Sequence, residues 1–360
     1  PNGFNFNLNG KNLSIKDVAN RLAMTQSDDV KKFEGQGVLK FNLDVDKKTG
    51  NKSPIRVNCS FGVKNGNLRI PSSKIAINKL TVAGFYSNEG GKKKEKLELK
   101  KITFKTKGGP FKGTLLLTQF AAPIFKGNAD GLLDLEVLHA LFSIPSVDML
   151  QGTINLSSQF VIQGNQNLDG SMDYDIKKLE GSVKLNNVKS KLLRDKRVFD
   201  SVNGLIYLRN NEAGIDNVSL KIGSSDFKVK GVFNEMVDYF KGTGSLLVRL
   251  EIKSKNISMQ DLGTDSKEGK IKKERAFILP NNISGKMYLD VEKLTYENHR
   301  FEKIKGNMTI SGRTIHFPRV SLVNGGANIR GSLTVEERTP EIFYISSQLV
   351  SKNVNFVNLL

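Results

Sequence analysis

The segment Gly306–Gly331, GNMTISGRTIHFPRVSLVNGGANIRG, contains the pattern that decides the fold of this chain. Apolar and polar residues alternate within it, which is typical of half-buried β-strands because successive side chains point to opposite faces. Two turn signals, Ser311-Gly312 and Asn324-Gly325, divide the segment into short extended runs. The segment therefore predicts antiparallel hairpins that are apolar on one face and polar, exposed to water, on the other.

Related segments occur twice earlier in the chain. Gly62–Gly84 and Gly204–Gly231 are also pairs of extended runs that are bracketed by glycines. A strand that begins with glycine precedes each of the three blocks, at Gly37, Gly152 and Gly285. This self-similarity indicates tandem units that stack in one dimension.

A second phrase marks the junctions between the units. It runs from an extended start into a leucine-containing helical turn, and it occurs at Gly10–Leu22, Asp130–Phe142, Ser254–Leu262 and Ser351–Leu360. We therefore place β units at residues 1–129, 130–253 and 254–350, with residues 351–360 as the start of a truncated fourth unit. Short helices are predicted from Ser14 to about Ala23 and from Leu135 to Phe142, where apolar residues recur at helical spacing.

Alternation and turn signals recur along nearly the whole chain. Further turns are expected at Asn65-Gly66, Gly90-Gly91, Gly108-Gly109-Pro110 and Asn210-Asn211. We predict a mainly β fold in which tandem antiparallel units curl into an elongated open groove, with a few short helices. The alternative is a closed sandwich or barrel, because alternation alone does not distinguish a filled interior from an open trough.

The groove hypothesis gives a function to the residues that share the apolar phase. A lipid's acyl chains need a continuous apolar surface, whereas its headgroup can stay in water at an open edge. The predicted lipid-binding residues are Leu39, Phe41, Leu43, Ile154, Leu156, Phe160, Val229, Phe233, Leu289, Val291, Met308, Ile310, Ile329 and Leu333. In the closed alternative, the same side chains fill a sealed core.

The composition excludes several classes of protein. The apolar fraction of 38% is sufficient for a core, so we do not expect the whole chain to be disordered. The longest apolar run, Thr114–Phe125, is too short and too interrupted to cross a bilayer as a helix. Cys59 is the single cysteine, so the chain forms no internal disulfide and no cysteine-based zinc site.

The chain is strongly basic. Lys plus Arg number 55 against 36 Asp plus Glu, which gives a formal net charge of +19. Lysine clusters such as Lys92–Lys94 either meet anionic headgroups or form a solvated exterior that keeps strand edges apart. The sequence contains no helix-turn-helix, aromatic RNA-binding strand or zinc finger, so nucleic acid is not a predicted partner.

Signals for catalysis are weak. His139, His299 and His316 lie far apart in the sequence and outside metalloprotease or nucleophile motifs. The sequence also lacks a phosphate-binding loop and a complete dinucleotide motif. We therefore predict no enzyme activity, no cofactor and no metal site.

The C-terminal stretch Ile278–Leu360 resembles the C-terminal region of AsmA-like proteins. The resemblance rests on Leu279-Pro280, Tyr296, Ile304 with Gly306, the Gly325-Gly326 pair before Gly331, and the closing Leu359-Leu360. It implies an architecture similar to that of bridge-like lipid carriers, in which antiparallel strands form a long trough with an apolar lining. It also implies attachment to the inner membrane of a double-membraned bacterium by an N-terminal helix, with extension into the periplasm.

The same resemblance implies a role in phospholipid supply to the outer membrane and in its integrity. Because the chain begins at Pro1 and ends within an unfinished phrase, we interpret it as a fragment that lacks the anchoring helix. The predicted function is to hold or conduct phospholipid through the periplasm, with the inner and outer membranes as partners. The alternative is a structural or adhesive β-repeat domain that binds protein or glycan.

Overall fold

The structure is a computed structural model, and it describes most of the chain. The described residues are 3–14, 34–50, 53–69, 76–89, 91, 94–142, 147–166, 172–193, 197–240, 242–262, 281–339 and 342–352. The predicted helix at Ser14–Ala23 lies outside the described residues, apart from Ser14 at the end of a strand. Of the phrase at Ser351–Leu360, only Ser351 and Lys352 are described.

The described elements are almost all strands. The first are β1 (Phe4–Ser14), β2 (Glu34–Lys47), β3 (Arg56–Arg69), β4 (Ala76–Ser87), β5 (Lys96–Lys105), β6 (Pro110–Thr118), β7 (Ile124–Asp134) and the helix α3 (Leu135–Phe142). They are followed by β8 (Val147–Gln166), β9 (Met172–Leu192), β10 (Val198–Arg209), β11 (Glu212–Ile222), β12 (Ser225–Asn234), α4 (Met236–Phe240) and β13 (Leu246–Ser254). The last are β14 (Ile257–Ser258), α5 (Met259–Leu262), β15 (Ile283–Tyr296), β16 (His299–Ser311), β17 (Thr314–Asn324), β18 (Ala327–Thr339) and β19 (Ile342–Lys352).

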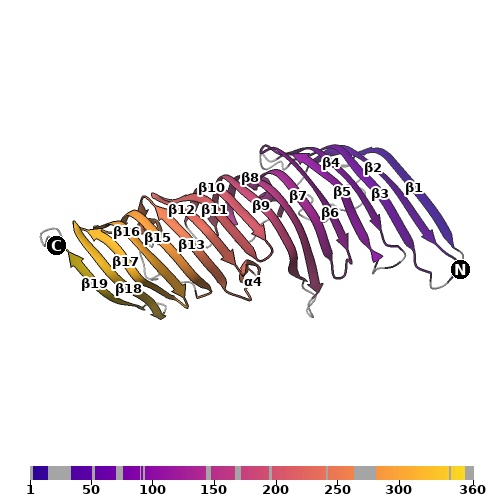
Figure 1. Cartoon of the computed structure of the whole chain (residues 1–360). Coiled ribbons are helices and arrows are strands. Elements are labelled where there is room, and N and C mark those ends of the chain that lie inside the picture. Colours follow the sequence, from indigo (N-terminus) through magenta and orange to yellow (C-terminus); the bar gives the residue numbers. More distant parts are fainter. Residues whose placement is uncertain are drawn as a thin grey trace, which may run out of the picture. The chain divides into compact units, whose positions relative to one another are not determined.

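Strands that follow one another in the sequence lie side by side in the sheet (Figure 1). Antiparallel pairing connects β1 through β8, β10 through β13, and β15 through β19. The sheet is open: among the described residues, the register pairs β1 with β2 and β19 with β18. The predicted fold class, mainly β with tandem antiparallel strands in an open sheet, is therefore confirmed.

The junction between β13 and β15 is parallel. Leu246 lies opposite Ile283 and Ser254 lies opposite Val291, so the two strands run in the same direction. The short β14 pairs with β15 in the same sense. A parallel pair needs a crossover connection instead of a tight hairpin, and α5 lies at the start of this connection.

The chain divides into two compact units. Unit 1 comprises Pro1–Ser143 with Thr153–Ser182, and unit 2 comprises Ile144–Gly152 with Val183–Leu360. The long strands β8 and β9 contribute residues to both units. The three tandem units of the sequence are a description of its repeats, and they remain a prediction.

Each unit is built from one layer of sheet. Among the described elements, the strands make their main contacts with their hydrogen-bonded neighbours, and the short helices α3, α4 and α5 pack against strands of the sheet. No second sheet of described residues packs over either unit. The closed sandwich is therefore not the fold of this chain.

The helical turns at two junctions are confirmed. α3 spans Leu135–Phe142, the range predicted from its apolar spacing, and it buries Leu135 and Val137. α5 ends the third copy of the junction phrase, where Asp261 accepts hydrogen bonds from the turn between β11 and β12. Short helices of this kind gain their stability from the sheet against which they pack, since isolated helices of such length are unstable.

The turn expected at Asn65-Gly66 is wrong. Both residues lie inside β3, where Asn65 has a φ of 51° and the register with β4 shifts between Val63 and Gly66. Asn is among the residues that best tolerate this left-handed conformation, which here forms a β-bulge instead of a hairpin turn. The turn at Asn210-Asn211, by contrast, connects β10 and β11 as predicted.

Candidate functional site: the apolar face of the sheet

In unit 1, strand register aligns a row of apolar and glycine residues across eight strands. The row runs from β1 to β8 through Gly10, Phe41, Phe61, Gly84, Leu99, Leu115, Gly127 and Phe160. Residues that are directly opposite in a sheet project from the same face. We name the face that contains this row the apolar face of unit 1.

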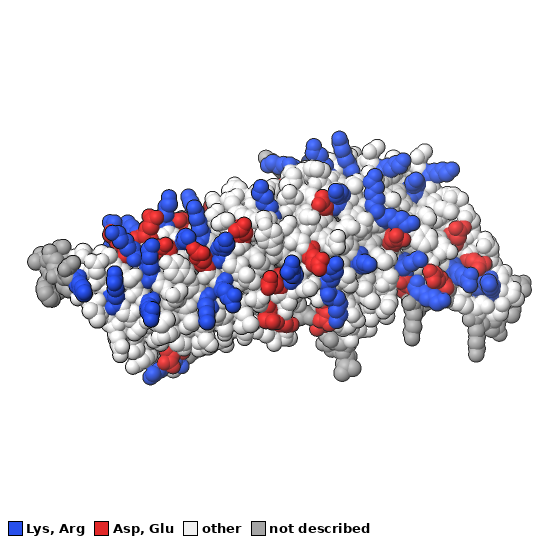
Figure 2. Space-filling model, viewed as in Figure 1, with Lys and Arg blue, Asp and Glu red and all other residues white. Residues whose placement is uncertain are grey.

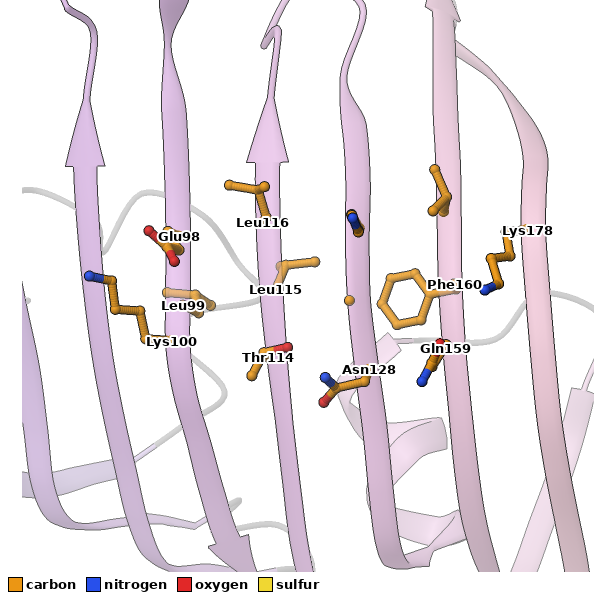
Figure 3. Close-up of a pocket in the computed structure, with 13 residues that line it drawn as sticks. Glu98, Leu99, Lys100, Thr114, Leu115, Leu116, Asn128, Gln159, Phe160 and Lys178 are labelled. Atoms are coloured by element: carbon orange, nitrogen blue, oxygen red, sulfur yellow. The ribbon is translucent and has the colours of Figure 1, made fainter.

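Phenyl rings cover the glycines of this row. A Cβ atom on Gly84 would lie 2.4 Å from Cζ of Phe61, and one on Gly127 would lie 2.8 Å from Cζ of Phe160. The ring of Phe41 lies equally close to the position that a Cβ on Gly10 would take. Figure 3 shows the Phe160 ring between its own strand and the strand that carries Asn128.

This pairing makes the apolar face shallow, because glycine has no side chain that projects from it. Glycine lets the ring of the neighbouring strand lie over its backbone, and the ring shields backbone that would otherwise meet water. A fully buried phenylalanine contributes about 1.5 to 3 kcal/mol, and these partly exposed rings contribute less. The result is a surface of rings and leucines without large projections above the glycines.

The predicted residues of unit 1 lie on this face. Leu43 is opposite Leu8 and Cys59, Leu156 is opposite Gly131, and Ile154 is opposite Leu133. Leu39, Phe41, Leu43, Ile154, Leu156 and Phe160 are all partly exposed. The register thus brings together six residues that the sequence places up to 121 positions apart.

The predicted residues of unit 2 also share one face, which we name the apolar face of unit 2. Phe233 is opposite Val248, Leu289 is opposite Gly306, and Leu333 is opposite Phe317. Register places the others beside them: Val229 opposite Ile252, Met308 opposite Met287, Ile310 opposite Gly285, Val291 opposite Ile304, and Ile329 opposite Leu322.

Part of the unit 2 face is buried. Leu246, Val248 and Ile310 form a core cluster, and Met236 and Tyr239 from α4 pack against it. Val291 is buried separately, with 2% of its surface exposed. Of the predicted lipid-binding residues, Val291 and Ile310 therefore support the sheet and present almost no surface to a ligand.

Several residues of the site were missed in the sequence. Phe4, Phe6 and Leu8 alternate on β1 and project from the apolar face of unit 1, where Phe6 is 50% exposed. Their alternation is visible in FNFNLN, so the sequence contained a signal for them. The Phe–Gly pairs carried no such signal, because Phe61 and Gly84 meet only through the register of β3 and β4.

The pKa values of two ionisable side chains on the apolar face of unit 1 reflect the low polarity of that face. Cys59 and Tyr86 lie opposite one another on β3 and β4. Burial raises the pKa of the Cys59 thiol. Burial, together with the negative charge of Glu95, raises the pKa of the Tyr86 hydroxyl. Both shifts favour the neutral form of these groups, which is consistent with the low polarity of the face.

Within the described ranges, no three His, Cys, Asp or Glu side chains are arranged to hold a metal ion. His316 Nδ1 lies 2.8 Å from Thr334 Oγ1, within the polar network of β17 and β18, and His139 lies on α3. What the two faces offer to a ligand is hydrocarbon contact.

Comparison of the chain with protein-family models, with curated proteins and with solved structures gives no match. Within the residues that the structure covers, no helix has the length and apolar character needed to cross a bilayer.

Proposed function

We propose that this chain is the periplasmic part of an AsmA-like protein and that it holds or conducts phospholipid along the apolar face of its sheet. The observation that carries the proposal is the row from Gly10 to Phe160, an apolar strip across eight strands over which no described element forms a second layer. The resemblance of the C-terminal stretch to AsmA-like proteins supports the family and the periplasmic location.

A phospholipid suits this surface for a physical reason. Each methylene that is removed from water contributes about 0.8 kcal/mol, so a partly covered acyl chain gains several kcal/mol without specific hydrogen bonds. Rings that lie over glycines form a mainly apolar floor along which a chain can slide. The headgroup remains in water at the open side of the layer, and the inner and outer membranes are the proposed donor and acceptor.

Adjacent leucines on β6 provide a sharp test. Leu115 projects from the apolar face, whereas Leu116 pairs with Glu98 and Lys126 on the opposite face. Phospholipid should be recovered from the purified protein by native mass spectrometry, and a photoreactive phospholipid should label it. Leu115→Asp should reduce both signals at least several-fold, because it places a carboxylate in the acyl path.

Leu116→Asp is the matched control, and it should leave recovery and labelling unchanged. Circular dichroism should establish that both variants are folded. Equal loss of lipid in the two variants, or no lipid in the unaltered protein and no labelling, would contradict the proposal.

A second candidate function rests on β19. All eleven of its residues are exposed, including Ile345 and Val350. An exposed apolar edge strand offers unpaired backbone groups to a strand of another protein, as an adhesive or structural domain would require. Val350→Lys should abolish association in light scattering if this is the function, and it should leave phospholipid recovery unchanged if lipid carriage is the function.

A further inference from the structure

The polar face of unit 1, opposite its apolar face, contains a hollow of roughly 540 Å³. Lys11, Lys40, Lys64 and Lys101 line it, and Gly62 and Ala83 form its floor. We name it the lysine hollow. Gly10, Phe41, Phe61 and Gly84 of the apolar row also border it, but alternation along each strand directs the Phe41 and Phe61 side chains to the opposite face from Lys40 and Gly62.

Strand register builds the hollow. Lys40 lies opposite Gly62, Gly62 opposite Ala83, and Ala83 opposite Lys101, so one row crosses four strands as Lys, Gly, Ala and Lys. The two small residues in the middle leave a depression, and a lysine stands at each end of it. Gly62 is one of the glycines that bracket the repeated block of the sequence, a feature that the apolar face does not explain.

The side chain of Lys40 leans over this floor. A Cβ atom on Gly62 would lie 3.3 Å from Cε of Lys40 and 3.2 Å from the carbonyl oxygen of Val82. The aliphatic part of Lys40 therefore covers the backbone of Gly62, which is buried. Long cationic side chains commonly pack their methylenes in this way while the ammonium group remains in water.

Among the described residues, the positive charge of the hollow has no acidic partner. No carboxylate is among its lining residues, and within the described part of the chain no ion pair engages any of its four lysines. Ser60, Thr81, Asn9 and Asn42 add hydroxyl and amide donors around the rim. Figure 2 shows the same excess along the upper part of unit 1, at the right, where few acidic side chains lie among Lys and Arg.

Other hollows on polar faces differ in this respect. The one around Lys112 contains Asp130, whose carboxylate lies 3.4 Å from the Lys112 ammonium, and also Glu180. A hollow in unit 2 is lined by Lys305, Arg319 and Arg330, and the Lys305 ammonium pairs with Asp290 at 3.2 Å. The lysine hollow is the better candidate for an external anion, because it gathers four cations and none of them has an acidic partner among the described residues.

We propose that the lysine hollow binds a phosphate group. Lysine ammonium groups act as compact charges toward phosphate, and several of them around one depression can meet several phosphate oxygens together with the hydroxyls of Ser60 and Thr81. The group belongs either to a soluble phosphate compound or to a headgroup at a membrane surface. The inference is independent of the proposed lipid carriage, because it concerns the opposite face of the sheet.

Titration with pyrophosphate tests the site. Calorimetry and backbone amide shifts in β2 to β5 should report saturable binding that weakens with added salt. Lys40→Gln, Lys64→Gln and Lys101→Gln should each weaken binding about fivefold, and the triple variant should abolish it. Lys112→Gln removes the same charge outside the hollow and should have little effect. Equal weakening by Lys112→Gln would overturn the proposal in favour of diffuse charge attraction.

A variant that fills the hollow tests whether binding depends on the shape of the hollow as well as on its charge. Gly62→Val retains all four lysine charges but occupies the floor and displaces the Lys40 side chain, and it should abolish pyrophosphate binding. If that variant fails to fold, Ala83→Leu fills the adjacent part of the floor and should have the same effect. Unchanged binding in a folded filled variant would overturn the site.

Vesicles distinguish the two sources of the phosphate. Flotation should compare vesicles of phosphatidylcholine alone with vesicles that also contain phosphatidic acid. Recruitment by phosphatidic acid that is lost in the triple variant identifies a headgroup, whereas pyrophosphate binding without recruitment identifies a soluble ligand. Absence of both overturns the proposal. Leu115→Asp should retain either form of binding, so that a failure of lipid carriage and a failure of this site can be told apart.

Discussion

The apolar faces of the two units follow the same alternation but are buried to different degrees. In unit 1 the face consists of phenylalanines that lie over glycines, and most of its side chains remain partly exposed. In unit 2 the aliphatic residues Leu246, Val248 and Ile310 form a buried cluster beneath α4. The difference teaches that alternation determines which face is apolar, whereas covering elements determine whether that face is a core or a surface.

This difference in burial also gives the two units separate roles. Buried aliphatic clusters contribute to stability because they remove apolar area from water in the folded state. A partly exposed face retains apolar area that a ligand can cover. Unit 2 should therefore be sensitive to core substitutions, and unit 1 should respond to ligand.

The largest expected effect on stability comes from a substitution in the buried cluster of unit 2. Val248 is 5% exposed, and its neighbour Leu247, on the other face of β13, is 45% exposed. Val248→Asp should destabilise unit 2 by several kcal/mol or unfold it, because it buries a carboxylate without a partner. Leu247→Asp should change the free energy of unfolding by less than about 0.5 kcal/mol. Urea unfolding would measure both, and similar losses in the two variants would contradict the assigned faces.

The next effect tests the aromatic cover in unit 1. Gly84→Val should displace the Phe61 ring and cost about 1 to 3 kcal/mol through overpacking. Phe61→Ala alone should cost less than a fully buried phenylalanine, because the ring lies on a partly exposed face. The double variant should be more stable than the sum of the single effects predicts, since valine fills the space that the ring leaves. Additive losses in chemical denaturation would show that ring and glycine are not coupled.

A smaller effect concerns the turn between β11 and β12 in unit 2. Burial of Asp261 opposes its ionisation, but hydrogen bonds from Ser224 and Ser225 outweigh burial and hold the pKa of Asp261 below its usual range. Its carboxylate therefore stabilises the fold above about pH 4, and this contribution is lost as the pH falls through the lowered pKa.

Asp261→Asn should cost about 1 to 2 kcal/mol at neutral pH and nearly nothing at the most acidic end of the range. Thermal unfolding as a function of pH would measure the convergence of the two proteins. A constant difference across the acid range would mean that the charge of Asp261 does not contribute.

The smallest effect is kinetic and concerns Cys59 in unit 1. Because burial raises the pKa of this thiol, a smaller fraction is thiolate near pH 8, and alkylation by iodoacetamide should be slower than in the unfolded chain. Bound phospholipid should slow it further, because Cys59 lies opposite Leu43 on the proposed acyl surface. Mass spectrometry would follow the modification. A rate that changes neither on unfolding nor on addition of lipid would mean that Cys59 does not lie on this surface.

Much of the fold could be predicted from local patterns. The helix at Leu135–Phe142 and the turn at Asn210-Asn211 follow from apolar spacing and turn residues alone. The bulge at Asn65 could not be predicted, because Asn-Gly favours a hairpin turn locally and only the pairing with β4 keeps β3 extended. The parallel pairing of β13 with β15 also depends on contacts across an intervening connection.

The amino-acid sequence by itself determined that the chain is a β protein whose strands have one apolar and one polar face, because the two-residue period of a strand converts alternation directly into faces. The tertiary structure decided which residues become neighbours across those faces. Register and bulges set Phe61 over Gly84 and Lys40 over Gly62, and α4 covers the cluster around Val248. These pairings join residues that are distant along the chain, and their free energy depends on the whole sheet, which no local pattern contains.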